Sequence, residues 1–256
     1  MEHLIGPLTF VLLLWLGMLL LLEIGRRVGV RQRKKSEGAG TGFGAIEGAV
    51  FGLLGLLIAF TFSGAASRFD TRRALIVEET NDIGTAYLRL NLLPQEAQTE
   101  LRDLFRQYVD ARLAFYREIL DPQAGQAQMA RVNQLQSEIW TRAVKASQQT
   151  GTTTASMLLL PALNSMFDIV TTRSAALEMH PPKIIFGMLA VLALACSLLA
   201  GYGMAASPRS WLHTIAFAAI LTLAVYLIID LEYPRAGLVQ VSSFDQMLID
   251  LRNSMK

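Results

Sequence analysis

The sequence predicts an all-α membrane protein with four transmembrane helices and a helical-bundle insert between the second and the third helix. Apolar residues make up 52% of the 256 positions and charged residues 17%, whereas about 25% of the residues of an ordinary soluble domain are charged. The apolar excess lies in four stretches of 19 to 23 residues that contain no Asp, Glu, Lys or Arg. The net charge of +2 and the single cysteine argue against a disordered chain, a disulfide scaffold and a nucleic-acid-binding protein.

The four apolar stretches are Leu4–Leu22, Gly48–Ala66, Ile184–Ala206 and Trp211–Ile229. A helix of about 19 residues reaches about 29 Å, which matches a hydrocarbon core of about 30 Å. No small-x-small cleavage site follows the first stretch, so we interpret it as a retained anchor rather than a signal peptide. The chain is therefore divided into a first transmembrane pair (1–66) with a basic loop (23–47), an insert (67–182), a second transmembrane pair (183–229) and a C-terminal tail (230–256).

The insert has the pattern of four helices. The first, 67–93, continues the second span without a break, and the others are expected at 95–120, 123–149 and 153–179, where apolar residues recur every three or four positions. Its 12 basic and 13 acidic residues balance, which argues against a nucleic-acid-binding module. In the tail, residues 238–242 alternate as in a short strand and residues 244–255 have the pattern of an amphipathic helix.

The distribution of charge predicts an orientation. The loop 23–47 and the turn 206–211 contain seven Lys and Arg residues. Because basic residues in short loops stay in the cytoplasm, this places both loops inside and the insert outside, in the periplasm of a bacterium. The predicted location is the inner (plasma) membrane, crossed several times.

The sequence contains none of the motifs that mark an enzyme. It has no Gly-x-Ser-x-Gly and no His-Glu-x-x-His, and its three histidines lie far apart, at His3, His180 and His213. The glycine-rich stretch Gly38–Gly44 lacks the Gly-Lys-Ser/Thr of a phosphate-binding loop, so we interpret it as a linker. We therefore expect no catalytic residue, no metal site and no cofactor, and we do not expect an enzyme.

The second span has an unusual glycine pattern. Gly44, Gly48 and Gly52 recur every fourth residue, and Gly55 follows. A helix face without side chains allows close approach, either of another helix in the same subunit or of a narrow axis in an oligomer. The spacing alone leaves both alternatives open.

Two segments resemble a known family. The run from Phe60 to Leu75 resembles the end of the second membrane helix of bestrophins, in which an aromatic residue is followed eight positions later by Arg, and the segment 230–237 resembles the acidic segment after their last membrane helix. Over nearly the whole chain, and in particular at Glu79–Arg89 and Asp230–Ser242, the sequence resembles the bacterial bestrophin-like family.

Bestrophins are pentameric anion channels, so the resemblance implies a homo-oligomer, a pentamer if bestrophin-like, that lies in the lipid bilayer and conducts small anions. The charge balance predicts that no nucleic acid is bound. The resemblance implies three groups of site residues: pore-lining candidates Gly52, Leu56, Phe60 and Ser63; a pore-mouth or structural motif of Arg68, Phe69, Asp70, Arg72 and Arg73; and a tail motif of Asp230, Glu232, Pro234 and Gly237. Gly52 departs from the bulky neck residue of bestrophins. The resemblance also implies a cytoplasmic insert, opposite to the orientation that the charges predict.

The alternative hypothesis is a non-conducting membrane sensor or scaffold. Its basis is the charge-balanced helical insert, which is similar to helical sensing domains carried on transmembrane helices and which would bind a partner.

Overall fold

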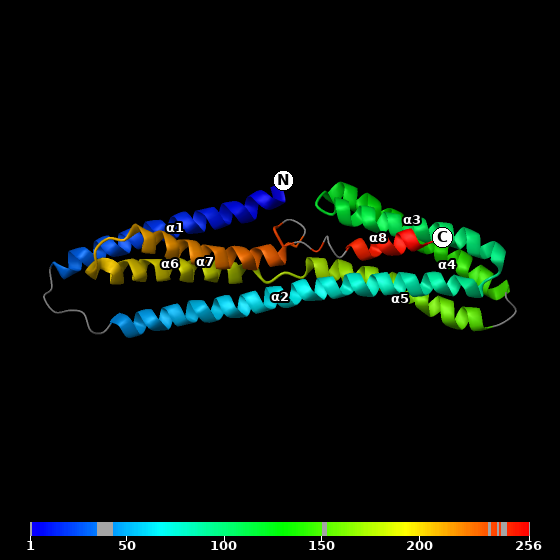
Figure 1. Cartoon of the computed structure of the whole chain (residues 1–256), viewed down its shortest axis with the longest axis horizontal. Coiled ribbons are helices and arrows are strands. Elements are labelled where there is room, and N and C mark those ends of the chain that lie inside the picture. The colour runs from blue at the N-terminus through cyan, green and yellow to red at the C-terminus, as the bar shows by residue number, and fades with distance from the viewer. Residues whose placement is uncertain are drawn as a thin grey trace. The chain divides into compact units, whose positions relative to one another are not determined.

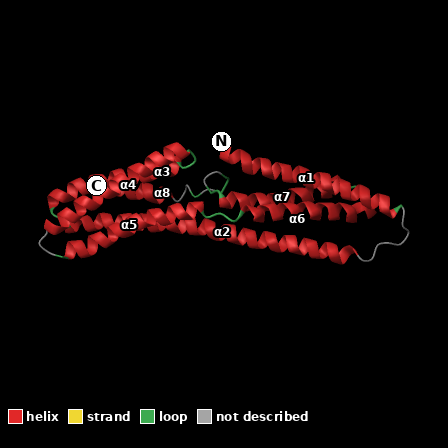
Figure 2. Cartoon of the chain, turned by 180° about the vertical axis from the view of Figure 1, so that it is seen from behind, coloured by secondary structure: helices red, strands yellow, loops and turns green. Residues whose placement is uncertain are grey.

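The structure is a computed structural model that describes residues 2–34, 43–149, 153–234, 237–239, 241 and 245–255. Within these residues all regular structure is helical, as Figure 2 shows, and four helices are long and apolar enough to cross a membrane. The predicted fold class, an all-α membrane protein, is therefore confirmed.

The helices are α1 (Glu2–Arg33), α2 (Phe43–Arg89), η1 (Leu90–Leu92), α3 (Gln95–Glu118), α4 (Pro122–Gln149), α5 (Thr154–Glu178), α6 (Lys183–Gly203), η2 (Met204–Ala206), α7 (Trp211–Glu232) and α8 (Asp245–Ser254). They form two compact units. The membrane unit comprises Met1–Ser67 and His180–Leu238, and the insert unit comprises Arg68–Met179 and Val239–Lys256. The long helix α2 contributes its first half to the membrane unit and its second half to the insert unit.

Two segments differ from the sequence-based expectation. Helix α1 continues to Arg33, so the first part of the expected loop 23–47 is helical, and residues 35–42 of that loop lie outside the described residues. The strand expected at 238–242 is wrong, because residues 238, 239 and 241 form bends; residues 240 and 242 lie outside the described residues. A lone alternating segment gains no ladder hydrogen bonds unless another strand pairs with it.

The membrane unit is held together by close contact between α1 and α6. Figure 1 shows α1, α6 and α7 side by side. Met18 and Leu22 of α1 are buried with Ala193 of α6 and Val225 of α7. An added Cβ at Gly201 of α6 would lie 2.1 Å from the backbone oxygen of Leu22, so the two helix backbones touch there. Such close approach of small residues is the usual source of helix association in lipid.

The first half of α2 packs on α6 and α7 through one face only. Leu54 and Ala65 are buried against Leu189, Cys196 and Ile228. The rings of Phe51 and Phe217 meet edge to face, with centroids 6.2 Å apart. This contact decides which side of α2 is left exposed.

The insert unit has its own apolar core. The periodic residues of α3, α4 and α5 meet there, including Phe105, Leu135, Ile139 and Leu163, and Leu248 of α8 joins them. Proline 161 lies inside α5. The core provides the framework for the polar cluster described below.

Candidate functional site

The four pore-lining candidates lie on the exposed face of α2. Leu56 is 53% exposed and Phe60 is 68% exposed, and Ser63 is exposed as well. A Cβ added at Gly52 would meet nothing within 4 Å. At about 100° per residue these positions fall on the side of the helix opposite Leu54, which packs on α6 and α7. A single copy of the membrane unit therefore leaves this face uncovered.

The exposed face is apolar apart from one hydroxyl. No charged residue occurs between Gly48 and Ala66. The hydroxyl of Thr61 donates to the backbone oxygen of Leu57 at 2.7 Å and is occupied within the helix. Ser63 is therefore the polar group that this face offers, beyond the aromatic ring of Phe60. Such a face can form an apolar constriction followed by a polar ring if several copies meet.

Arg72 of the predicted pore-mouth motif is part of the insert fold. It is 4% exposed. Its Nε donates to the backbone oxygen of Ala176 at 3.0 Å and its Nη2 to that of Met179 at 2.8 Å. These are carbonyls at the C-terminal end of α5, where a cation also compensates the helix dipole. Within the insert unit, Arg72 of α2 therefore binds the C-terminal end of α5.

The neighbouring residues of the motif interact with each other. Arg73 donates to Asp70 at 3.1 Å and its guanidinium lies 5.6 Å from the ring centroid of Phe69. Arg68 is half-buried, whereas Asp70 is exposed. The motif therefore supplies an exposed ion pair and a helix cap rather than a cluster of equivalent cations.

The tail motif closes a turn after α7. Asp230 is 4% exposed, and its Oδ1 accepts hydrogen bonds from the hydroxyl of Tyr226 at 3.1 Å and from the backbone N–H of Leu238 at 2.8 Å. A Cβ added at Gly237 would lie 1.8 Å from the same oxygen. The Asp230 carboxylate therefore binds the backbone that follows α7. Position 237 is a glycine because a side chain there would collide with this carboxylate.

Glu232, the second acid of the motif, is fully buried beside His180. The distance between His180 Nδ1 and Glu232 Oε2 is 3.6 Å. The imidazole also stacks on the ring of Tyr233, with centroids 4.7 Å apart, and Pro234 follows in a turn. These contacts join the residues just before α6 to the end of α7.

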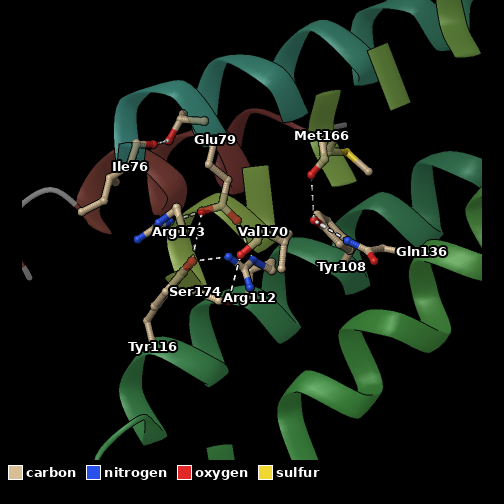
Figure 3. Close-up of polar contacts among 11 residues, drawn as sticks. Ile76, Glu79, Tyr108, Arg112, Tyr116, Gln136, Met166, Val170, Arg173 and Ser174 are labelled. Atoms are coloured by element: carbon tan, nitrogen blue, oxygen red, sulfur yellow. Dashed lines mark hydrogen bonds and ion pairs between the residues drawn. The ribbon is translucent and has the colours of Figure 1, made fainter. Parts of the chain in front are cut away.

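The insert unit contains a buried polar cluster that the sequence did not predict (Figure 3). It contains Glu79 of α2, Arg112 and Tyr116 of α3, and Arg173 of α5. The Nε of Arg112 donates to Glu79 Oε1 at 2.5 Å, and Arg173 Nη1 forms an ion pair with Glu79 Oε2. The hydroxyl of Tyr116 accepts from Arg112 Nη2 and donates to Glu79 Oε2 at 3.3 Å. One carboxylate therefore holds three helices together.

One sequence signal could have revealed the cluster. Arg112 occupies an apolar position of the α3 stripe, and it is 0% exposed, as is Glu79. Fully buried charges are rare unless they are paired, so an arginine within an apolar stripe indicates a buried acid elsewhere. The partner could not be identified, because Glu79 and Arg173 lie 33 and 61 positions away from Arg112.

A buried tyrosine lies beside the cluster on α3. Burial raises the pKa of Tyr108, one turn before Arg112, and its hydroxyl lies 3.4 Å from the backbone oxygen of Met166. A tyrosine that keeps its proton donates a hydrogen bond and does not act as a base. Among the residues that the structure describes, no group of three or more His, Cys, Asp or Glu side chains could hold a metal ion.

Comparison with known proteins identifies similar chains. The family described as Bestrophin-like domain matches residues 11–244. Two structures of variants of a bacterial bestrophin homologue from Klebsiella pneumoniae have TM-scores of 0.70 and 0.67, each at 16% identity; they cover 95% and 93% of this chain and 98% of the other. A structure described as a membrane protein has a TM-score of 0.65 at 16% identity and covers 94% of this chain and 99% of the other. No curated protein matches the sequence.

Proposed function

Because the chain belongs to the Bestrophin-like domain family, we propose that it is a homo-oligomeric ion channel in which the α2 helices line a pore for small anions. The observation behind this proposal is the uncovered face of α2, formed by Gly52, Leu56, Phe60 and Ser63. The other face of the same helix is packed against α6 and α7.

Rotational symmetry explains how such a face would be used. Closed rings of identical subunits place the same surface of every copy around one axis. If α2 faces that axis, Phe60 forms the narrowest ring because its side chain is the largest of the four. Gly52 leaves the opposite end of the pore wide. The family resemblance favours five subunits.

We expect the permeating ion to be a weakly hydrated anion. The face has no carboxylate between Gly48 and Ala66. Rings of apolar side chains cannot replace the water molecules that an ion loses when it enters the pore. Anions that lose hydration water at a low free-energy cost would therefore pass more easily. We expect the permeability sequence thiocyanate, iodide, chloride.

Phe60→Ala tests the pore assignment. The purified protein in planar bilayers should give single-channel steps, and the substitution should change their conductance at least twofold. Ile220→Ala is the matched control, because Ile220 of α7 is as exposed as Phe60, 68%, and lies on a different helix. Its conductance should equal that of the unmodified protein. Silent bilayers with several anions and voltages, together with a monomer or dimer in detergent, would contradict the channel and favour the sensor or scaffold.

The orientation is tested separately. We propose that the basic end of α1 and Arg209 lie in the cytoplasm and the insert outside, as their charges predict. In a Cys196→Ala background, Ser137→Cys in the insert should react with an impermeant maleimide in intact cells. Ser207→Cys, before α7, should react only after permeabilisation. The reverse pattern would place the insert in the cytoplasm, as the resemblance to bestrophins implies.

A further inference from the structure

The exposed face of α1 changes from apolar to basic along one continuous stripe. Its residues follow at spacings of three and four: Leu13, Leu16, Leu20, Ile24, Arg27, Arg31 and Lys34, and all are exposed. In a bilayer that α1 crosses, the apolar members would face the acyl chains. About 17 Å of helix separates Leu20 from Arg31 and Lys34 is about 5 Å further. Helical side chains lean toward the N-terminus of the helix, so the long basic side chains point back toward the lipid headgroups.

This orientation of α1 is fixed by its packing. On the opposite face, a Cβ added at Gly25 would lie 2.0 Å from the backbone oxygen of Leu198, and one at Gly29 would lie 2.7 Å from that of Tyr202. Helix α1 cannot rotate without breaking this contact with α6. The basic residues are therefore held on the outer surface.

The charges at this end of the membrane unit are only partly compensated. Glu23 binds two guanidinium groups, Arg27 at 2.8 Å and Arg209 at 2.9 Å. For Arg31, Arg33 and Lys34, no ion pair is found within residues 2–34, 43–149 and 153–234. A second carboxylate, Glu47 of α2, lies at the same end, with its Oε2 3.7 Å from a Cβ added at Gly203 of α6. The basic residues of α1 and Arg209 outnumber these two carboxylates, so an external anion would be attracted to the stripe.

An aromatic residue marks the membrane interface at the same place. The guanidinium of Arg209, which is paired with Glu23, lies 4.1 Å from the ring centroid of Trp211. Trp211 is 58% exposed. Tryptophan beside basic residues is typical of the boundary between acyl chains and headgroups.

We propose that Arg27, Arg31 and Lys34, with Arg209 beside them, form a binding site for the phosphate of an anionic phospholipid. We call these four residues the basic stripe. The lipid's acyl chains lie along Leu20 and Ile24, and its headgroup phosphate accepts hydrogen bonds from the arginines. A soluble phosphate has no acyl chains and cannot make the contacts with Leu20 and Ile24. The site does not depend on ion conduction.

Lipid titration of the full-length protein in detergent tests the proposal. Dioctanoyl phosphatidylglycerol should bind at least tenfold more tightly than dioctanoyl phosphatidylcholine, because each basic residue near an anionic headgroup contributes about fivefold. The triple variant Arg27→Gln, Arg31→Gln, Lys34→Gln should lose this preference. Raising the salt concentration should also weaken it.

A matched triple variant controls for net charge. Arg117→Gln, Arg131→Gln and Lys145→Gln remove the same charge from exposed positions in the insert unit, and this variant should keep the lipid preference. Equal unfolding temperatures of the two triple variants show that both are folded. The proposal would be overturned if both triple variants lost the lipid preference equally, or if the α1 variant kept it. It would also be overturned if glycerol phosphate, which has no acyl chains, competed as well as the lipid.

Discussion

The membrane unit and the insert unit are both helical bundles, but they use their apolar and polar residues in opposite ways. In the membrane unit large apolar side chains such as Leu13, Phe60 and Ile220 point outward, and glycines bring the helix backbones into contact inside. In the insert unit the apolar side chains point inward around a buried ion cluster. The surrounding medium explains the contrast. Exposing a leucine side chain to lipid has no free-energy cost, so burial of apolar side chains does not stabilise the membrane unit and close packing of the helices is the main source of its stability.

The two units also place their charges differently. The insert unit buries Glu79 and Arg112 completely and pairs them. The membrane unit has no Asp, Glu, Lys or Arg between Leu4 and Leu22 and keeps its ionisable residues near the ends of its helices, with basic residues at the end of α1 and the buried Asp230 and Glu232 at the end of α7. In a medium without water a charge has to reach the interface, whereas in a folded domain it can be retained with a partner.

The largest expected effect comes from removing the buried carboxylate. Glu79→Ala should destabilise the insert unit by about 3–5 kcal/mol, because Arg112 would remain buried without its carboxylate. Amide hydrogen exchange of α3 and α5 in the full-length protein measures this loss. Glu96→Ala, an exposed acid in the first turn of α3, is the control and should cost less than about 1 kcal/mol. Equal exchange in both variants would show that the cluster does not hold the helices together.

An intermediate effect is expected at the backbone contact of the membrane unit. Gly201→Ala should lower the free energy of unfolding by about 1–3 kcal/mol, because its Cβ would lie 2.1 Å from the oxygen of Leu22. Gly187→Ala, in the same helix with nothing within 4 Å, should be neutral or stabilise by up to about 1 kcal/mol. Thermal unfolding of both variants in one detergent makes the comparison. If both substitutions behave alike, close packing of α1 on α6 is not the source of stability.

The smallest effect is expected at the surface of the insert unit. Arg252 of α8 binds Asp110 of α3 through two hydrogen bonds of 2.8 and 2.9 Å, and both residues are partly exposed. Arg252→Ala should cost about 0.2–1 kcal/mol, and the cost should fall as salt is added. Limited proteolysis of the tail reports the detachment of α8. A loss as large as that of Glu79→Ala would mean that exposure does not decide the strength of these ion pairs.

The glycines show how far the sequence could predict the candidate site. The regular spacing of Gly44, Gly48 and Gly52 indicated a face that allows close approach, and the structure leaves this face uncovered. Gly25 and Gly29 of α1 are also four residues apart, yet both touch the backbone of α6 in the same chain. Spacing reports which residues share a helix face, but the partner of that face depends on residues distant in sequence.

The sequence by itself determined the four spans, the helical insert and the family, because uncharged runs, helical periodicity and short motifs are local properties of the chain. Tertiary structure alone decided that Arg72 caps α5, that Asp230 binds the backbone at Leu238, and that Glu79 meets Arg112 and Arg173. Each of these contacts joins residues that the chain separates and packing brings within a few ångströms. The strength of these polar contacts depends on burial, because electrostatic interactions are stronger away from water, and only the assembled fold buries the residues.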